Sequence, residues 1–428
     1  MKQRIAVIGG GWAGCAAALT LAQAGIKLTL FEAGLTLGGR ARSVQVNNSL
    51  LDNGQHILLG AYTQTLKLIS EVGSADSATS LMRLPLTLEQ PPDFSLVCPL
   101  LPAPLHLLAG LFGAHGLNWH EKFAAARWAR HALTHTPINT TDTLVSNLLK
   151  EQPEKVRKLL WEPLCISALN TAPEHASAQV FKQVLVAAFA GRRCHSDLLL
   201  PRRDLTAMFP QPAAQRIAEL GGEVRLRARV KSLSSDAGGV SLMAQNDSTT
   251  YDHIILAVAP QHLASLCRNI PELADTIQTV ETYDYEPIAT GYLQYPLSVR
   301  LSRPILALSG EPAQFVFDRG QTHGQTGLLA VVVSAASNLL GQSQTNWLAQ
   351  AERQLARIAT LPTPLWRKTI IEKQATYACR PNMPRLDNIT PHPRIFLAGD
   401  YTSVVYPATL ESATLSGVKS ALALLDRL

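Results

Sequence analysis

The sequence lacks the features that mark several common classes of protein. Its 428 residues contain six cysteines, and no two of them form a Cys-x-x-Cys pair or stand at a zinc-site spacing. No apolar run reaches the roughly 18 uninterrupted residues of a membrane-spanning helix. We find no P-loop, no metal signature, no Ser-His-Asp order and no block of Lys and Arg. We therefore expect no metal site and no nucleic-acid partner.

Charge is also scarce, since Asp, Glu, Lys and Arg make up 16% of the chain, whereas hydrophobic residues make up 46%. This composition is typical of an enzyme with a large core, and the length predicts about two to three domain-sized units. Isolated cysteines are typical of buried small residues in a reducing compartment, which predicts a cytoplasmic protein. The formal net charge of +6 predicts a mild attraction to anionic lipid.

The chain opens with a βαβ pattern. Residues 4–8 form a short apolar run that predicts a buried parallel strand, residues 12–24 predict a helix, and residues 27–31 predict a second strand. The first run is too short for a signal peptide, and glycines interrupt it.

Residues 9–14 carry a G-x-G-x-x-G motif between that strand and that helix. Gly9 allows the tight turn, Gly11 lets the backbone approach a pyrophosphate, and Gly14 lets the helix pack close to the strand. Glu32 follows the second strand, eighteen residues after Gly14, where a carboxylate can accept hydrogen bonds from ribose hydroxyls. The pattern predicts a dinucleotide at the helix N-terminus.

Similar signals recur along the chain. Residues 63–200 look mostly helical. Further strands are expected at 223–233, 240–244, 251–258, 288–295, 328–334 and 394–398, and further helices at 343–359 and 407–427. We predict a nucleotide-binding domain (1–70, 200–262 and 370–428) interleaved with a substrate domain (71–199 and 263–369).

Three segments add polar groups. Gly39 and Arg40 would place a guanidinium beside the pyrophosphate, and residues 51–56 (Leu-Asp-Asn-Gly-Gln-His) follow. Gly399 and Asp400 end a predicted strand with a carboxylate suited to a ribityl chain. Pro407 and Thr409 suit the start of the helix expected at 407–427, whose first turn includes Leu410 and Glu411 and whose N-terminus could point at a flavin ring.

Together these segments resemble the superfamily of FAD-containing amine oxidases, phytoene desaturases and protoporphyrinogen oxidases, over the whole chain. The resemblance implies an α/β fold with a Rossmann-like FAD-binding domain, and a substrate domain of mixed sheet and helices. It implies that FAD is the cofactor, that Val230 contacts the adenine, and that Gly54 and Gln55 pass the flavin. The chain has Thr36 where the family usually has a basic residue.

Residues 52–62, 161–164 and 407–413 resemble a narrower group, the squalene-associated FAD-dependent desaturases, or hydroxysqualene dehydroxylases of hopanoid synthesis. This resemblance implies reductive removal of an allylic hydroxyl from a C30 isoprenoid to give squalene. Two alternatives stay open: a flavin desaturase or amine oxidase acting on another lipid or amine, and a flavoprotein without turnover. The sequence identifies no electron donor.

Several residues permit two interpretations. His56 could protonate the leaving hydroxyl, or it could only bond the backbone and shape the ring pocket. Tyr283 and Tyr285 could line the substrate channel or be half-buried strand residues. Glu411 could act as an acid or complete the helix dipole.

The apolar, proline-broken run at 96–117 lies before Trp119 and several basic residues. It predicts either an interfacial helix pair that contacts the membrane or an internal helix of the substrate domain. We favour membrane contact near 96–130, on the inner face of the cytoplasmic membrane.

Overall fold

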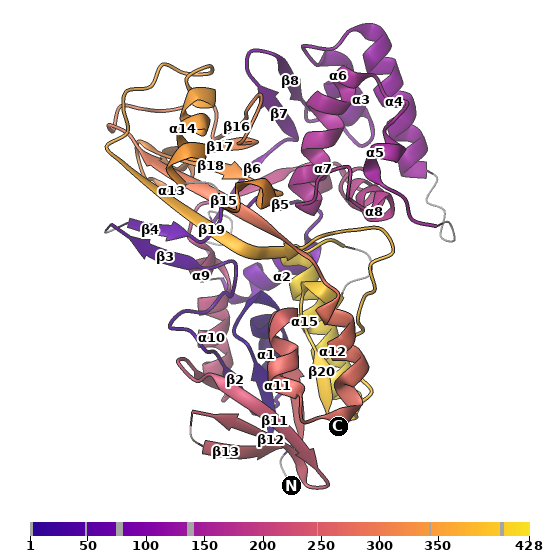
Figure 1. Ribbon diagram of the computed structural model, residues 1–428, viewed down its shortest axis with the longest axis vertical. Coiled ribbons are helices and arrows are strands. Elements are labelled where there is room, and N and C mark those ends of the chain that lie inside the picture. Colours follow the sequence, from indigo (N-terminus) through magenta and orange to yellow (C-terminus); the bar gives the residue numbers. More distant parts are fainter. Residues whose placement is uncertain are drawn as a thin grey trace.

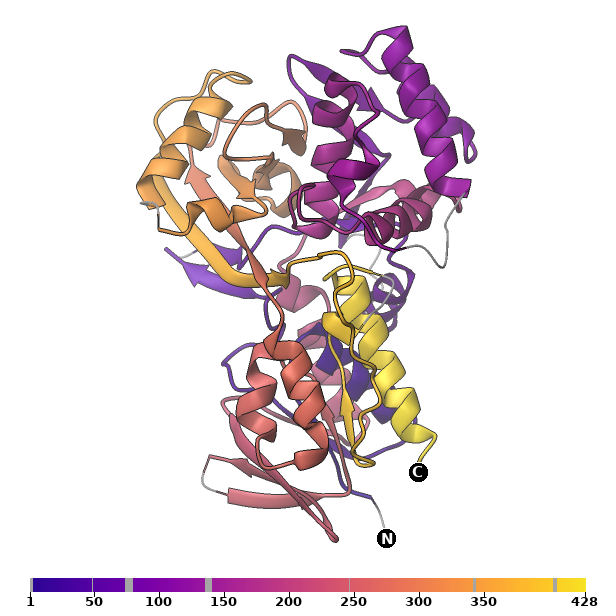
Figure 2. The same ribbon diagram turned by 45° about the vertical axis from the view of Figure 1, so that its right-hand side comes forward.

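The protein is described by a computed structural model that covers residues 3–47, 49–73, 80–134, 141–245, 247–341, 344–402 and 406–428. A unit built on a parallel sheet occupies one end of the long axis. An antiparallel sheet and a helical region lie side by side at the other end (Figures 1 and 2). The chain passes between the two ends several times.

The parallel sheet has five strands in the order β10-β2-β1-β14-β20. Their bounds are Ile5–Ile8 (β1), Leu28–Phe31 (β2), Glu223–Arg225 (β10), His253–Leu256 (β14) and Ile395–Leu397 (β20). Every residue of β1 is buried, as expected for a central strand covered on both faces. The sheet therefore draws strands from all three segments predicted for the nucleotide-binding domain, while the exact domain boundaries stay a prediction.

Helix α1 (Trp12–Gln23) packs between α10 (Pro210–Glu219) and α15 (Leu410–Leu425). Its approach to α15 depends on Gly417, because a Cβ there would lie 2.2 Å from the carbonyl oxygen of Ala13. The unit is completed by the following elements: α2 (Thr63–Val72), α9 (Leu205–Met208), α11 (Leu263–Cys267), α12 (Ala274–Glu281), and a three-stranded sheet of β11 (Val230–Asp236), β12 (Gly239–Ala244) and β13 (Asp247–Tyr251).

The antiparallel sheet has the order β16-β17-β18-β15-β19. Its strands are β15 (Tyr285–Gln294), β16 (Ile305–Ala307), β17 (Phe315–Asp318), β18 (Leu328–Val333) and β19 (Trp366–Tyr377), with helices α13 (Arg319–His323) and α14 (Gln344–Leu355). Helix α14 packs on β15 at Gly291, where a Cβ would lie 2.9 Å from the ring of Trp347.

The helical region contains α3 (Leu105–Gly113), α4 (Trp119–Thr134), α5 (Val145–Leu148), α6 (Glu154–Val156), α7 (Glu162–Leu169) and α8 (Ala178–Phe189). Small sheets join it to the rest: β3 (Ser43–Val46) with β4 (Ser49–Asp52), β5 (Leu58–Leu59) and β6 (Leu81–Leu84) with β9 (Leu198–Pro201), and β7 (Thr87–Gln90) with β8 (Phe94–Val97).

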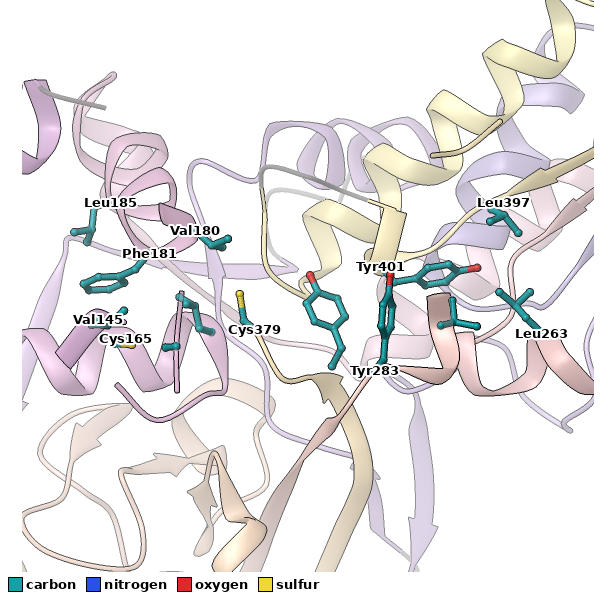
Figure 3. Packing of buried hydrophobic residues seen from close by; sticks show 14 of the residues in the cluster. Val145, Cys165, Val180, Phe181, Leu185, Leu263, Tyr283, Cys379, Leu397 and Tyr401 are labelled. Carbon is teal, nitrogen blue, oxygen red and sulfur yellow. The ribbon is translucent and has the colours of Figure 1, made fainter. Parts of the chain in front are cut away.

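One hydrophobic cluster links the helical region to the parallel sheet. Figure 3 shows Cys379 between Phe181 and its helical neighbours on one side and Tyr283 and Tyr401 on the other. Because this core is continuous, the two ends of the molecule are packed against each other and are not merely joined by linkers.

The predicted fold class is confirmed, but two local predictions were wrong. The segment 63–200 is mostly helical, as predicted, and it also contains the short strands β6 to β9. The expected strand at 223–233 is two strands in different sheets, separated by Arg227 with a left-handed φ of 55°. The expected strand at 251–258 likewise divides between β13 and β14.

Candidate functional site

A cavity of about 940 Å³ lies between the carboxyl ends of the parallel strands and the antiparallel sheet. This is the expected place for a ligand in an open α/β sheet. Most of the predicted binding residues line this cavity: Gly9, Gly11, Glu32, Gly39, Arg40, Gly54, Gln55, His56, Val230, Gly399, Asp400 and Leu410.

The glycine loop approaches the cavity in the manner that its motif predicts. Gly9 has a φ of 110°, and a Cβ on Gly14 would lie 1.8 Å from the Gly9 carbonyl oxygen, so both glycines are required by the protein itself. Gly11 differs, since a Cβ there would meet only the Cα of Gly39, at 3.8 Å. No side chain caps the N-terminus of α1 at Gly11. Its free N–H groups and open space fit a phosphate.

Glu32 lies directly after β2, as predicted. Its carboxylate accepts hydrogen bonds from the backbone N–H groups of Gly10 (2.8 Å) and Gly34 (2.6 Å). Each oxygen keeps a further lone pair, so these bonds hold the carboxylate at the cavity wall and leave it able to accept ribose hydroxyls.

A partly buried ion pair lies in the cavity wall. Arg40 donates from Nη2 to both carboxylate oxygens of Asp400 at 2.8 Å, and its Nη1 donates to the carbonyl oxygen of Ala375. The Gly-Gly segment that carries Arg40 reaches the first loop, because the N–H of Gly38 bonds the Gly10 carbonyl oxygen at 2.8 Å. Three segments that are distant in sequence therefore meet at one place.

Two predicted residues serve the structure and do not line the cavity. Gly14 lies behind the loop, where it packs α1 against Gly9. Glu411 is buried, and its carboxylate accepts bonds from the N–H groups of Gln64 (2.9 Å) and Thr65 (2.8 Å) at the start of α2. That carboxylate serves a helix terminus, which fits the dipole interpretation but not the acid interpretation. The start of α15 is capped by Thr409, which is the cap that the sequence predicted.

The segment Asp52–His56 is held by an arginine that sequence reasoning missed. Arg319 is fully buried and donates from Nη1 to Asp52 Oδ2 (3.0 Å) and to Gln55 Oε1 (2.8 Å). Tyr292 donates its hydroxyl to the Asp52 carbonyl oxygen at 2.7 Å. Both residues come from the antiparallel sheet and its helix α13, and no motif surrounds them in the sequence.

His56 lines the cavity next to these groups. Its Nδ1 lies 2.8 Å from the carbonyl oxygen of Gly54. Burial lowers the pKa of His56, although that hydrogen bond and the carboxylate of Asp52 act in the opposite direction. A lowered pKa favours the neutral ring, so it gives no support to the predicted role of His56 as a general acid. That role stays a hypothesis.

The two tyrosines lie in the protein interior. Tyr283 is buried beside Tyr377 and donates its hydroxyl to the Pro384 carbonyl oxygen at 2.9 Å. Tyr285 begins β15 and packs partly buried against the same cluster. Neither residue lines the cavity. The interpretation as a half-buried strand residue fits Tyr285, whereas Tyr283 is fully buried just before the strand.

A second, apolar chamber of about 160 Å³ adjoins the main cavity. Ile57, Tyr62, Ser167, Ala168, Phe315 and Thr409 line both spaces. The rest of its wall is mainly aliphatic and aromatic, contributed by β7, α7 and α8. The arrangement therefore joins a polar, glycine-lined space to an apolar one.

Comparison with known proteins agrees with this geometry. The model of the family "Flavin containing amine oxidoreductase" matches residues 12–425. The chain belongs to this family. The family binds FAD, and the glycine-lined cavity fits the cofactor, because Gly11 leaves open space at an uncapped helix N-terminus.

Relatives of this flavin family differ in what they act on. The chain is 25% identical to the hydroxysqualene dehydroxylase of Sinorhizobium fredii over 440 residues, which cover 98% of each chain. It is 24% identical to the 15-cis-phytoene desaturase of Capsicum annuum over 448 residues, or 96% of this chain and 76% of that one. An oxidoreductase structure from Methanosarcina mazei has the same fold, with a TM-score of 0.76 and 15% identity over 98% of this chain and 100% of the other.

Proposed function

We propose that this flavin-dependent oxidoreductase removes the allylic hydroxyl of hydroxysqualene and gives squalene. The observation that carries the proposal is the apolar chamber, which adjoins the glycine-lined cavity and shares six lining residues with it. A C30 hydrocarbon has no polar group except its hydroxyl, so it requires an apolar wall along most of its length. The similarity to the dehydroxylase of S. fredii supports the same substrate class.

The assignment of FAD contacts follows the predicted pattern. We propose that Gly9, Gly11 and Gly39 surround the pyrophosphate, that Glu32 holds the adenosine ribose, and that Val230 contacts the adenine. Arg40 with Asp400 would then border the ribityl chain, while Leu410 at the N-terminus of α15 and Gly54 would border the flavin ring.

The reaction needs two electrons. Reduced FAD, when bound, would supply both electrons as a hydride for the allylic carbon, and the hydroxyl would leave as water with a proton from the reduced flavin or from solvent. The chain's own part is to exclude bulk water and to hold the allylic carbon in place, which the aliphatic side chains of β7, α7 and α8 can do.

We expect reduced holoenzyme to convert hydroxysqualene to squalene. The test is anaerobic incubation with dithionite-reduced protein, followed by mass spectrometry of the extracted lipid. Chemical reduction makes the result independent of the physiological donor. Oxidised holoenzyme is the control and should leave the alcohol unchanged. Recovery of unchanged alcohol from the reduced enzyme would contradict the proposal.

A desaturase is the second candidate, since the same chamber suits a hydrocarbon and phytoene desaturases are among the relatives. It would use oxidised flavin and give a product with an added double bond. An amine substrate is less favoured, because the one carboxylate that lines the apolar chamber, Glu89, is paired with Arg303 at 3.2 Å. A flavoprotein without turnover would change none of these lipids.

We also propose that the protein rests on the membrane through α3 and α4. These helices lie at the outer edge of the helical region (Figures 1 and 2). Together with the segment just before α3, they expose large apolar side chains: Leu100, Leu101, Leu105, Leu108, Trp119 and Phe123. We call these six residues the apolar patch. Within the part of the chain that the structure describes, no helix is long and apolar enough to span a membrane.

The charges around the apolar patch favour an anionic bilayer as its partner. Residues 94–134 carry one acid, Glu121, against the exposed Arg127 and Arg130, whereas Lys122 is buried and bonds the Phe112 carbonyl oxygen. His106 of α3 lies 3.0 Å from Ser196, which brings the exposed Arg192 to the same end of the molecule, while Arg193 is paired with Asp197 at 2.8 Å. A patch of apolar side chains with a basic rim is typical of interfacial binding.

We expect the protein to float with vesicles that contain phosphatidylglycerol, and less with purely zwitterionic vesicles. Replacing Trp119, Phe123 and Leu105 together with Ser should reduce the bound fraction by about tenfold or more, because each change removes an exposed apolar side chain that the bilayer would bury. Exposed Leu297, replaced with Ser, lies outside the apolar patch and serves as the control. Equal flotation of the triple variant and the control would refute this proposal.

A further inference from the structure

The amide of Gln55 is oriented by the buried arginine behind it. Arg319 Nη1 lies 2.8 Å from Gln55 Oε1. A guanidinium has donors only, so Gln55 must present its oxygen to Arg319. Its NH₂ group is then the end left for the cavity, and it has no hydrogen-bond partner among the described residues.

Arg319 itself has little freedom to move. Besides the bond to Gln55, it bonds Asp52 Oδ2 at 3.0 Å and Gln325 Oε1 at 2.6 Å, and it lies over the ring of Tyr292. Because the side chain is fully buried, these contacts fix the guanidinium before any ligand binds. The orientation of the Gln55 amide is therefore set in advance.

The neighbouring His56 presents a hydrogen-bond acceptor to the cavity, where Gln55 presents a donor. The Gly54 carbonyl oxygen can only accept, so the Nδ1 of His56 at 2.8 Å carries the hydrogen. Burial lowers the pKa of this ring, which keeps Nε2 without a proton. Nε2 is thus an acceptor, and it too has no partner among the residues that the structure describes.

The donor of Gln55 and the acceptor of His56 lie close to the apolar chamber. Ile57, the next residue, lines both the main cavity and the apolar chamber. Gln55 and His56 therefore line the main cavity directly beside the residue that it shares with the apolar chamber. A hydroxyl both accepts one hydrogen bond and donates another, whereas a hydrocarbon does neither and a protonated amine cannot accept.

We propose that Gln55 and His56 recognise the hydroxyl of an isoprenoid alcohol, Gln55 donating to its oxygen and His56 Nε2 accepting its hydrogen, with Arg319 as the positioning residue for Gln55. The choice of an isoprenoid alcohol rests on the proposed function. A site that hydrogen-bonds a hydroxyl discriminates against the analogue that lacks it, because its polar groups would otherwise stay unpaired.

The test uses two probes with one carbon skeleton, farnesol and farnesene, titrated into oxidised holoenzyme while flavin absorbance is recorded. The readout is the ratio of the two dissociation constants, which cancels differences in how each variant packs the hydrocarbon. Gln55→Glu and Gln55→Met both remove the donor, and each should lower the preference for the alcohol by about tenfold. Gln45→Glu, on the exposed face of β3, is the matched control and should leave the ratio unchanged.

Arg319→Lys keeps the charge beside Asp52 but loses the fork that reaches Gln55, so it should lower the preference by about threefold while FAD stays bound. An unchanged ratio in both Gln55 variants would overturn the inference. So would loss of FAD from them, which would make Gln55 a cofactor ligand. Binding of the two probes does not depend on turnover. If the wild type prefers farnesol and the Gln55 variants lose that preference, but hydroxysqualene is not converted, only the proposed function is refuted.

Discussion

A Gly11→Val variant is expected to fold and to lose its FAD. Gly11 has a φ of −73°, which any residue adopts, and a Cβ there would meet only the Gly39 Cα at 3.8 Å. The protein itself therefore tolerates a side chain at this position. The branched side chain would instead occupy the open space at the uncapped N-terminus of α1, where we place the pyrophosphate.

The matched control is Gly14→Val, five residues beyond the first glycine of the same motif. Its Cβ would lie 1.8 Å from the Gly9 carbonyl oxygen, so this change should destabilise the fold by about 3 kcal/mol or more. Flavin absorbance of the purified proteins and their thermal unfolding, compared with deflavinated wild type, separate the two effects. A yellow Gly11→Val protein would show that the pyrophosphate lies elsewhere.

Arg319→Ala should lower the free energy of unfolding by about 3–5 kcal/mol, since it leaves the Asp52 carboxylate buried without its cation. The two side chains are almost completely buried and lie 3.0 Å apart. Asp52 would keep only the Leu205 N–H, at 2.9 Å, as a donor to its carboxylate within the described part of the chain, apart from His323 at 3.6 Å.

The pair is best measured as a double-mutant cycle with Asp52→Asn and Arg319→Met, in chemical denaturation. Each single variant leaves one buried charge without its partner. The double variant should therefore lose less stability than the sum of the two single losses, and the difference, which is the coupling free energy, should be about 2 kcal/mol or more. The exposed pair Arg225 and Glu223 is the control, for which we expect a coupling below about 1 kcal/mol. Additive losses at Arg319 and Asp52 would mean that the two charges do not stabilise each other.

The cofactor side of the site was predictable because its signals are local. The glycine loop, Glu32 and the Gly399-Asp400 turn each place their groups by backbone geometry over a few residues. The sequence therefore indicated which residues meet the cavity, even though Asp400 and Arg40 are far apart in the chain. For Glu411 the local signal was incomplete, because the terminus that its carboxylate serves belongs to another helix, α2.

The substrate side was not predictable in the same way. Arg319 carries no motif, and only the pairing of β17 with β18 brings α13 to the loop after β4. The strands β7 and β8 do alternate between buried and more exposed residues, as in Leu88, Phe94 and Leu96, but the surrounding leucines and prolines obscured that period of two. Strand β19 is rich in charged residues and resembles a surface segment.

The order of strands in the parallel sheet has a consequence for biosynthesis. β14 lies between β1, made among the first residues, and β20, made after the whole substrate unit, and α1 completes its packing only against α15. During synthesis the sheet therefore stays incomplete, because β14 has no partner on its outer edge until β20 has been made. Such late, long-range closure is intrinsically slow and leaves apolar surface open to chaperones, so the holoenzyme can assemble only after the C-terminal helix has emerged.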